Sequence, residues 1–156
     1  MAKLSPLTLS PHAASFISAA LRHIRDAEHL LEAGSAHCSP DQAYHLAGFA
    51  PECARKGTLS LRWLDHAIGH AVDPFSEDLL EFAIALDPIA HRYDPLAYAS
   101  RYPSLVRWTV DARYEHTGTR KAPEAEAICA EARQAVDAVV IALWADGRLP
   151  GKDIPW

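Results

Sequence analysis

The run Arg113-Tyr114-Glu115-His116 is the most chemically varied cluster in this chain. An arginine can hold a phosphate through two hydrogen bonds, a tyrosine can stack on a base, and a histidine can carry a proton near neutral pH. Cleavage of RNA through its 2′-hydroxyl needs a base at that hydroxyl and a cation at the phosphate. The structural alternative is that Arg113 pairs with a core carboxylate such as Glu52, while Tyr114 packs inside the protein.

A second group of charged side chains is formed by Glu52 and Lys56. A spacing of four residues places both on one face of a helix. If the pair is exposed, it contributes only about 0.2–0.5 kcal/mol to stability. The alternative is that the two side chains line a polar groove together with Arg113.

The histidines and cysteines do not indicate a metal site. His66 and His70 have the spacing of two ligands on a helix, but a helical metalloprotease needs a glutamate where Ala67 stands. Gly69 also ends that helix, so His70 is better placed to cap its C-terminus. The cysteines are three in number and form no CxxC pair. We expect no cofactor and no metal.

The composition indicates a single globular domain. The chain has 156 residues, of which 49% are hydrophobic, and no apolar run approaches the roughly 20 residues that cross a bilayer. Its first residues lack the apolar core of a secretory signal, so we expect a cytoplasmic protein without membrane contact.

Cys53 and Cys129 lie on apolar helix faces and are expected to be buried. A net charge of −5 argues against a large nucleic-acid surface but leaves room for a small basic pocket.

One short basic group lies on the first predicted helix. Arg22, Arg25 and His29 could face RNA or a partner, but Asp26 and Glu28 interrupt them. A solvated helix face is the simpler interpretation.

Apolar residues recur with the helical period over most of the chain, and Ser-Pro pairs mark two helix starts. The first helix begins after Ser10 and ends at Gly34, and the second begins after Ser39 and runs to Gly69. Pro51 lies inside the second helix and predicts a kink, or alternatively two shorter helices.

The second half of the chain is divided by prolines. A third helix begins at Asp73-Pro74, short pieces are expected over 88–101 and 103–115, and a long amphipathic helix runs from Pro123 to Asp146-Gly147. No segment alternates like a strand. The expected fold is all-α, an antiparallel up-and-down helical bundle with three long helices plus short helices. It comprises an arm (1–9), the bundle domain (10–146) and an irregular tail (147–156).

Four parts of the chain, in order, carry a family resemblance: the helix Ala47-Gly-Phe-Ala-x-Glu52-Cys-Ala-x-Lys56, the turn Gly69-His70 followed by Asp78-Leu79-Leu80, the segment Trp108-x4-Arg113-Tyr114, and the closing amphipathic helix. Over residues 40 to 143 the chain resembles the HEPN (higher eukaryotes and prokaryotes nucleotide-binding) superfamily. The resemblance implies a HEPN-like helical bundle that is often dimeric. Members cleave RNA as toxins or antiviral effectors, partner a small nucleotidyltransferase, or act as non-catalytic binding modules.

Catalytic HEPN members carry an arginine followed by a histidine after four to six residues. Here only two residues separate Arg113 from His116, while Arg22 and His29 enclose six but lie on the first helix. The resemblance therefore implies a module without catalysis. We expect it to bind nucleotide or RNA, or to pair with a nucleotidyltransferase, and to form a homodimer.

The expected binding residues surround one groove: Glu52, Lys56, Arg113, Tyr114 and His116. In it, Arg113 would bind phosphate, Tyr114 would stack or position the ligand, and His116 would be the proton carrier. The alternative is a metal-independent endoribonuclease of the toxin–antitoxin or antiviral type that uses Arg113 and His116.

Overall fold

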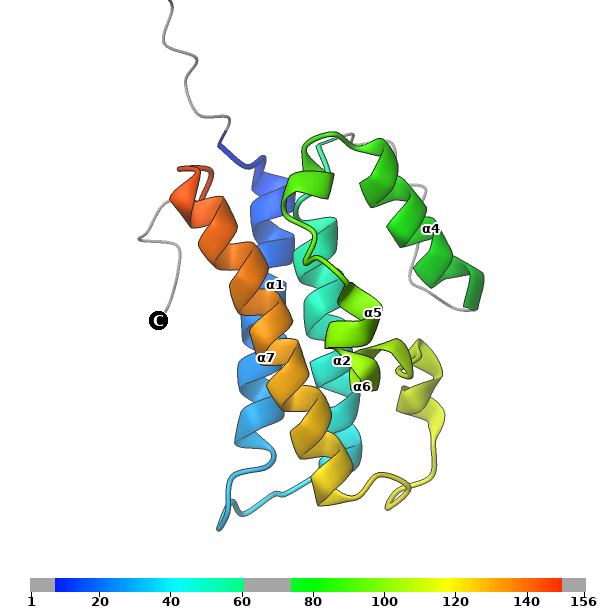
Figure 1. Cartoon of the computed structure of the whole chain (residues 1–156). Coiled ribbons are helices and arrows are strands. Elements are labelled where there is room, and N and C mark those ends of the chain that lie inside the picture. Colours follow the sequence, from blue (N-terminus) through cyan, green and yellow to red (C-terminus); the bar gives the residue numbers. More distant parts are fainter. Residues whose placement is uncertain (1–7, 61–73, 150–156) are drawn as a thin grey trace, which may run out of the picture.

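The computed structural model describes residues 8–60 and 74–149, and in these ranges the chain is helical without a strand (Figure 1). The α-helices are α1 (Pro11–His29), α2 (Pro40–Lys56), α4 (Pro74–Leu86), α5 (Tyr98–Arg101), α6 (Pro103–Val106) and α7 (Ala122–Ala145), with short 3-10 helices η1 (Ala90–Arg92) and η2 (Val110–Tyr114). The expected all-α class is confirmed, with α1, α2 and α7 as the three long helices of the bundle.

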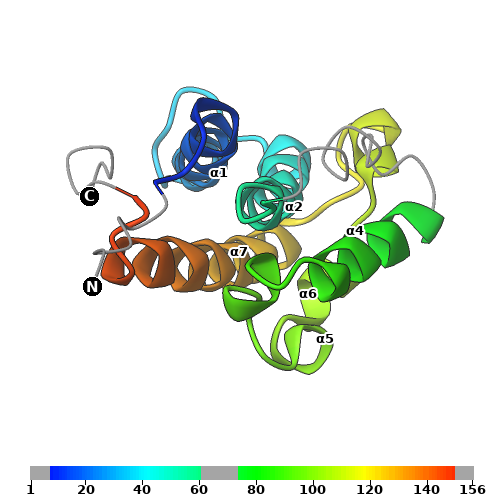
Figure 2. The ribbon, with the colours of Figure 1, turned by 90° about the horizontal axis from the view of Figure 1, so that it is seen from above.

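The three long helices lie side by side and share the main hydrophobic core (Figures 1 and 2). Leu9 N donates to the carbonyl of Arg148 at 3.1 Å, so the start of α1 lies beside the end of α7. Asp41, at the start of α2, accepts from the amide of Gly118, shortly before α7. α1 is therefore antiparallel to both α2 and α7, which run in the same direction. The short elements between α4 and α7 return the chain to the end of the bundle where α7 begins.

The helix starts follow the signals in the sequence. Ser10 Oγ accepts a hydrogen bond from Ala13 N at 3.1 Å, and Ser39 Oγ accepts one from Gln42 N at 3.4 Å. Each serine satisfies an amide that the helix itself leaves without a partner. The end of α1 is less well predicted, because the helix stops one turn before Gly34, whose φ of 86° places it in the following loop.

The expectation of an unbroken second helix to Gly69 is wrong. α2 continues through Pro51 but ends at Lys56. The hydroxyl of Thr58 donates to the carbonyl of Arg55 at 2.6 Å, which satisfies one of the carbonyls freed at the helix end. The remainder of the predicted helix, from residue 61 onward, lies outside the described residues.

The indole of Trp108 occupies the place where α2 has no side chain. A Cβ built at Gly48 would lie 2.2 Å from Trp108 Cδ2 and Cε2, closer than any real contact. The ring also lies edge-on to Phe49, with the ring centroids 5.2 Å apart. Trp108 is buried, so it ties the segment between α6 and η2 to the middle of α2.

We expect Gly48→Ala to destabilise the protein by about 1–3 kcal/mol, the usual cost of overpacking a filled site. The sign is diagnostic, since the same change in an open helix position gains about 1 kcal/mol. Urea unfolding measures the change. In a Trp108→Ala background the penalty should disappear, and equal losses in both backgrounds would contradict the proposed clash.

A second, smaller core joins α4 to η1 and to the chain after α2. At its edge the carboxylate of Asp87 is fully buried. It accepts from Ser60 N at 2.6 Å, from Ser60 Oγ at 2.8 Å, from Ile89 N at 2.9 Å and from Ala90 N at 3.0 Å. A single side chain thus satisfies the backbone of two segments that are distant in the sequence.

Asp87→Ala should lower the free energy of unfolding by roughly 3 kcal/mol, because it leaves several buried donors without an acceptor. The same change at the exposed Asp111 is the matched control and should stay within about 0.5 kcal/mol of the wild type. Chemical denaturation of both variants checks this. Equal effects would show that the Asp87 hydrogen bonds add nothing to stability.

Two of the three cysteines are buried, as expected, and Cys38 is exposed. Burial raises the pKa of Cys53 to about 11 and that of Cys129 to about 12. Both thiols therefore stay protonated at neutral pH and are poor nucleophiles.

Candidate functional site

The segment Arg113 to His116 lies on the surface at the end of η2. Val110 and Ala112 are buried and anchor η2, which leaves the side chains that follow free to face solvent. Arg113 stacks on Tyr114, with its guanidinium carbon 4.6 Å from the ring centroid. Tyr114 is 72% exposed, and His116 is exposed as well. The arrangement presents a cation and an aromatic ring together to solvent.

The alternative in which Arg113 pairs with a core carboxylate and Tyr114 packs inside the protein is wrong. Arg113 is exposed and has no ion pair among the described residues, so it does not pair with Glu52, and Tyr114 does not pack in the bundle. Glu52 instead accepts from Lys56 Nζ at 2.6 Å. The predicted same-face pair is therefore formed, and it is buried, since the two side chains are only 11% and 5% exposed.

The five predicted site residues fall into two groups. Arg113 acts electrostatically on His45 of α2, whereas Glu52 lies two helical turns further along that helix. Seven residues of helix correspond to a rise of about 10 Å. No described contact joins Arg113 to the Glu52–Lys56 pair. The role of each group in binding stays a prediction, and the exposed group around Arg113 is the one that a ligand can reach.

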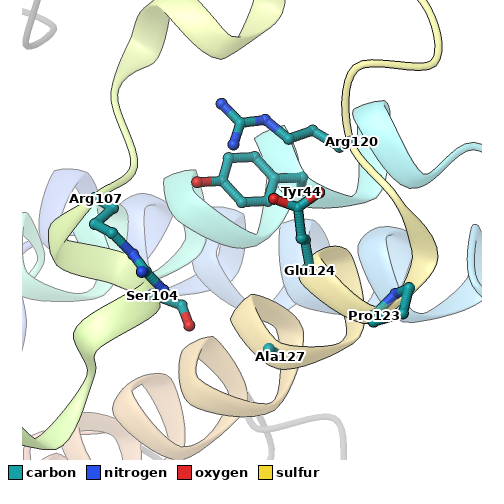
Figure 3. Close-up of a pocket in the computed structure, with 7 residues that line it drawn as sticks. All are labelled: Tyr44, Ser104, Arg107, Arg120, Pro123, Glu124 and Ala127. Atoms are coloured by element: carbon teal, nitrogen blue, oxygen red, sulfur yellow. The ribbon is translucent and has the colours of Figure 1, made fainter.

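A pocket that sequence reasoning missed opens beside this segment (Figure 3). Its volume is about 490 Å³, and it lies between α2, α6 and the start of α7. The residues that line it are Tyr44, Ser104, Arg107, Arg120, Pro123, Glu124 and Ala127. The sequence places Tyr44 in the apolar stripe of α2, which is correct for its ring but gives no sign of a pocket at its hydroxyl.

Arg120 forms one wall of the pocket and is held in place on two sides. Its guanidinium carbon lies 4.2 Å from the centroid of the Tyr44 ring. Its Nε donates to Glu115 Oε2 at 2.7 Å, and its Nη2 donates to the other oxygen of that carboxylate. Its backbone amide, together with that of Gly118, donates to Asp41 at 2.7 Å. These two amides lower the pKa of Asp41, so the carboxylate that anchors the loop stays charged.

Arg107 lies on the opposite side of Tyr44 and is exposed (Figure 3). Among the described residues it has no carboxylate partner, in contrast to Arg120. The Tyr44 side chain is 5% exposed, and burial raises the pKa of its phenol. The hydroxyl therefore stays protonated at neutral pH and is able to donate a hydrogen bond.

A cluster of aromatic rings packs in the part of the core next to Tyr44. His45 is 8% exposed, and its ring centroid lies 4.9 Å from that of Phe49 and 6.0 Å from that of Trp108. His23 of α1 adds a second imidazole, 6.0 Å from Phe49. The Nδ1 atoms of both histidines are buried without a hydrogen-bond partner among the described residues. Burial lowers the pKa of His45, and electrostatic interactions with Arg113 and His23 lower it further.

Because burial also lowers the pKa of His23, both imidazoles bind protons less readily in the folded state than in the unfolded chain. The unfolded state then binds more protons at acid pH, so stability is complete above the unfolded pKa of about 6.5 and falls as the pH drops below it. Urea unfolding between pH 5 and pH 8 should show this loss. The curve should be flatter in His45→Gln, and parallel curves would contradict the prediction.

The described residues contain no group of three or more His, Cys, Asp or Glu side chains able to hold a metal ion. His66 and His70 lie outside them. In the same part of the chain, no helix combines the length and the apolar character needed to cross a bilayer. Family models, curated proteins and solved structures provide no match to this chain.

Proposed function

We propose that the chain is a HEPN-like helical module that binds RNA or a nucleotide, without cleaving it, at the surface around Arg107, Arg113, Tyr114 and His116. One observation carries the proposal. Two arginines without a carboxylate partner among the described residues lie around the same turn of α2, next to an exposed tyrosine. Arginine holds phosphate and aromatic rings stack on bases, which are the two contacts that single-stranded nucleic acid offers.

The surrounding charges support this assignment. Arg55 pairs with Asp94 at 3.0 Å, and Arg133 pairs with Glu28 at 2.6 Å, so the charges of these two arginines are matched by neighbouring carboxylates. Arg113 instead stacks on Tyr114 with its charge unmatched. In a protein of net charge −5, such a surface favours a short stretch of phosphates over a long duplex.

Arg113→Ala should weaken the binding of a short single-stranded RNA by about tenfold, and Tyr114→Ala should do the same through lost stacking. Fluorescence anisotropy at several salt concentrations measures both effects. The arginine variant should also show a smaller salt dependence, by about 0.7 in the logarithmic slope for one lost phosphate contact. Arg22→Ala, at an exposed arginine on α1, is the matched control. An equal loss in that variant would move the binding surface to α1.

The alternative activity is metal-independent RNA cleavage by Arg113 and His116. One observation favours it, namely that both residues are exposed on the same segment. RNA incubated with the protein in the presence of a chelator tests it. Cleavage that persists in wild type and stops in His116→Ala would establish the nuclease, whereas intact RNA in both samples supports the binding module.

The proposal includes a homodimer, with a nucleotidyltransferase as the alternative protein partner. Light scattering on the purified chain tests the dimer. Co-purification from the host tests the nucleotidyltransferase.

A further inference from the structure

The pocket at Tyr44 contains three polar groups whose hydrogen-bonding capacity the described residues leave unused. The Tyr44 hydroxyl makes no hydrogen bond with any of them, although Tyr44 is only 5% exposed. The guanidinium of Arg107 has no ion pair there. Glu124 uses one oxygen, Oε2, to accept from Lys121 N at 3.0 Å, and its other oxygen has no described partner.

The remaining polar groups around the pocket are already satisfied. Arg120 is paired with Glu115 through two of its nitrogens. Ser104 Oγ donates to Glu131 Oε1 at 2.8 Å, and the Ser104 amide donates to Oε2 of the same carboxylate at 2.7 Å. Glu115 and Glu131 are therefore engaged by other donors, and neither pairs with Arg107.

The three unused groups define a ligand. Figure 3 shows the Tyr44 hydroxyl on the side of the pocket where Arg107 lies, with the Arg120 guanidinium stacked over the ring. Two donors, one of them charged, match the oxygens of a phosphate. The free oxygen of Glu124 is an acceptor, so it matches a hydroxyl or amino group on the same ligand. A volume of about 490 Å³ lies in the range that holds small molecules.

We propose that this pocket binds a ribonucleoside 5′-monophosphate, with the phosphate on Arg107 and the Tyr44 hydroxyl and a ribose hydroxyl on Glu124. The choice of a nucleotide rests on the proposed function. The requirement for a phosphate and a neighbouring hydroxyl or amino group rests on the pocket alone.

Calorimetric titration with adenosine 5′-monophosphate, adenosine and ribose 5-phosphate tests the inference. The monophosphate should bind at least tenfold more tightly than adenosine, since a charge-assisted hydrogen bond is the strong kind. Tyr44→Phe keeps the ring under Arg120 and removes only the hydroxyl. It should fold with wild-type stability and bind the monophosphate about tenfold more weakly. Tyr98→Phe, on α5 and outside the pocket, is the matched control and should bind like the wild type.

Equal affinities for adenosine and its monophosphate would overturn the inference, as would unchanged binding in a folded Tyr44→Phe protein. Ribose 5-phosphate binding as tightly as the nucleotide would overturn the assignment to a nucleotide. RNA binding that depends on Arg113, without any binding of the monophosphate, would support the proposed function and contradict the inference that the pocket binds a nucleotide. Monophosphate binding that depends on Tyr44, without RNA binding, would support nucleotide binding in the pocket and contradict RNA binding at the surface around Arg113.

Discussion

The candidate site depends on the contact between Trp108 and the bare backbone at Gly48. No other residue type at position 48 lets the indole approach this closely, because even a methyl group would overlap the ring. The residue before Trp108 is Arg107, and the residues after it form η2, which ends in Arg113 and Tyr114. Seating one buried ring on α2 therefore places the pocket arginine and the exposed stacked pair around the same part of that helix. The long helices provide the frame, and this contact aligns the short segment with it.

Buried charges in this fold are consistently given partners. Arg55 is only 2% exposed, and it donates to Asp94 and to Glu81 at 3.0 and 3.2 Å. Asp87 and the Glu52–Lys56 pair follow the same rule. Since an unpaired buried charge is strongly destabilising, these networks hold the elements in one arrangement. The hydroxyl of Tyr44 and the exposed guanidinium of Arg107 lie outside these networks, and both line the same pocket.

Most of the fold could be predicted from the sequence because its signals are local. The serine caps, the proline positions and the apolar period identified the three long helices and their starts. The end of α2 could not be predicted in this way. Residues after Lys56 continue an apolar helical pattern, and the hydrogen bonds that turn the chain come from Thr58 and from the distant Asp87. Gly57, the C-cap of α2, is a local stop signal that the apolar pattern on either side obscures, whereas the contact with Asp87, 27 residues from Ser60, leaves no local trace.

For the same reason, only part of the candidate site could be predicted from the sequence. Arg113, Tyr114 and His116 could be found as a cluster because they are neighbours in the sequence. Tyr44 and Arg107 come together only in the fold. Moreover, Tyr44 fits the hydrophobic pattern of α2, and this assignment is right for every atom except the hydroxyl. A periodic pattern describes which face a residue occupies, but it carries no information about where the end of a long side chain emerges. Sites built from the polar tips of core residues are therefore the ones that sequence patterns miss, and they are found by asking which polar atoms that line a pocket make no hydrogen bond within the fold.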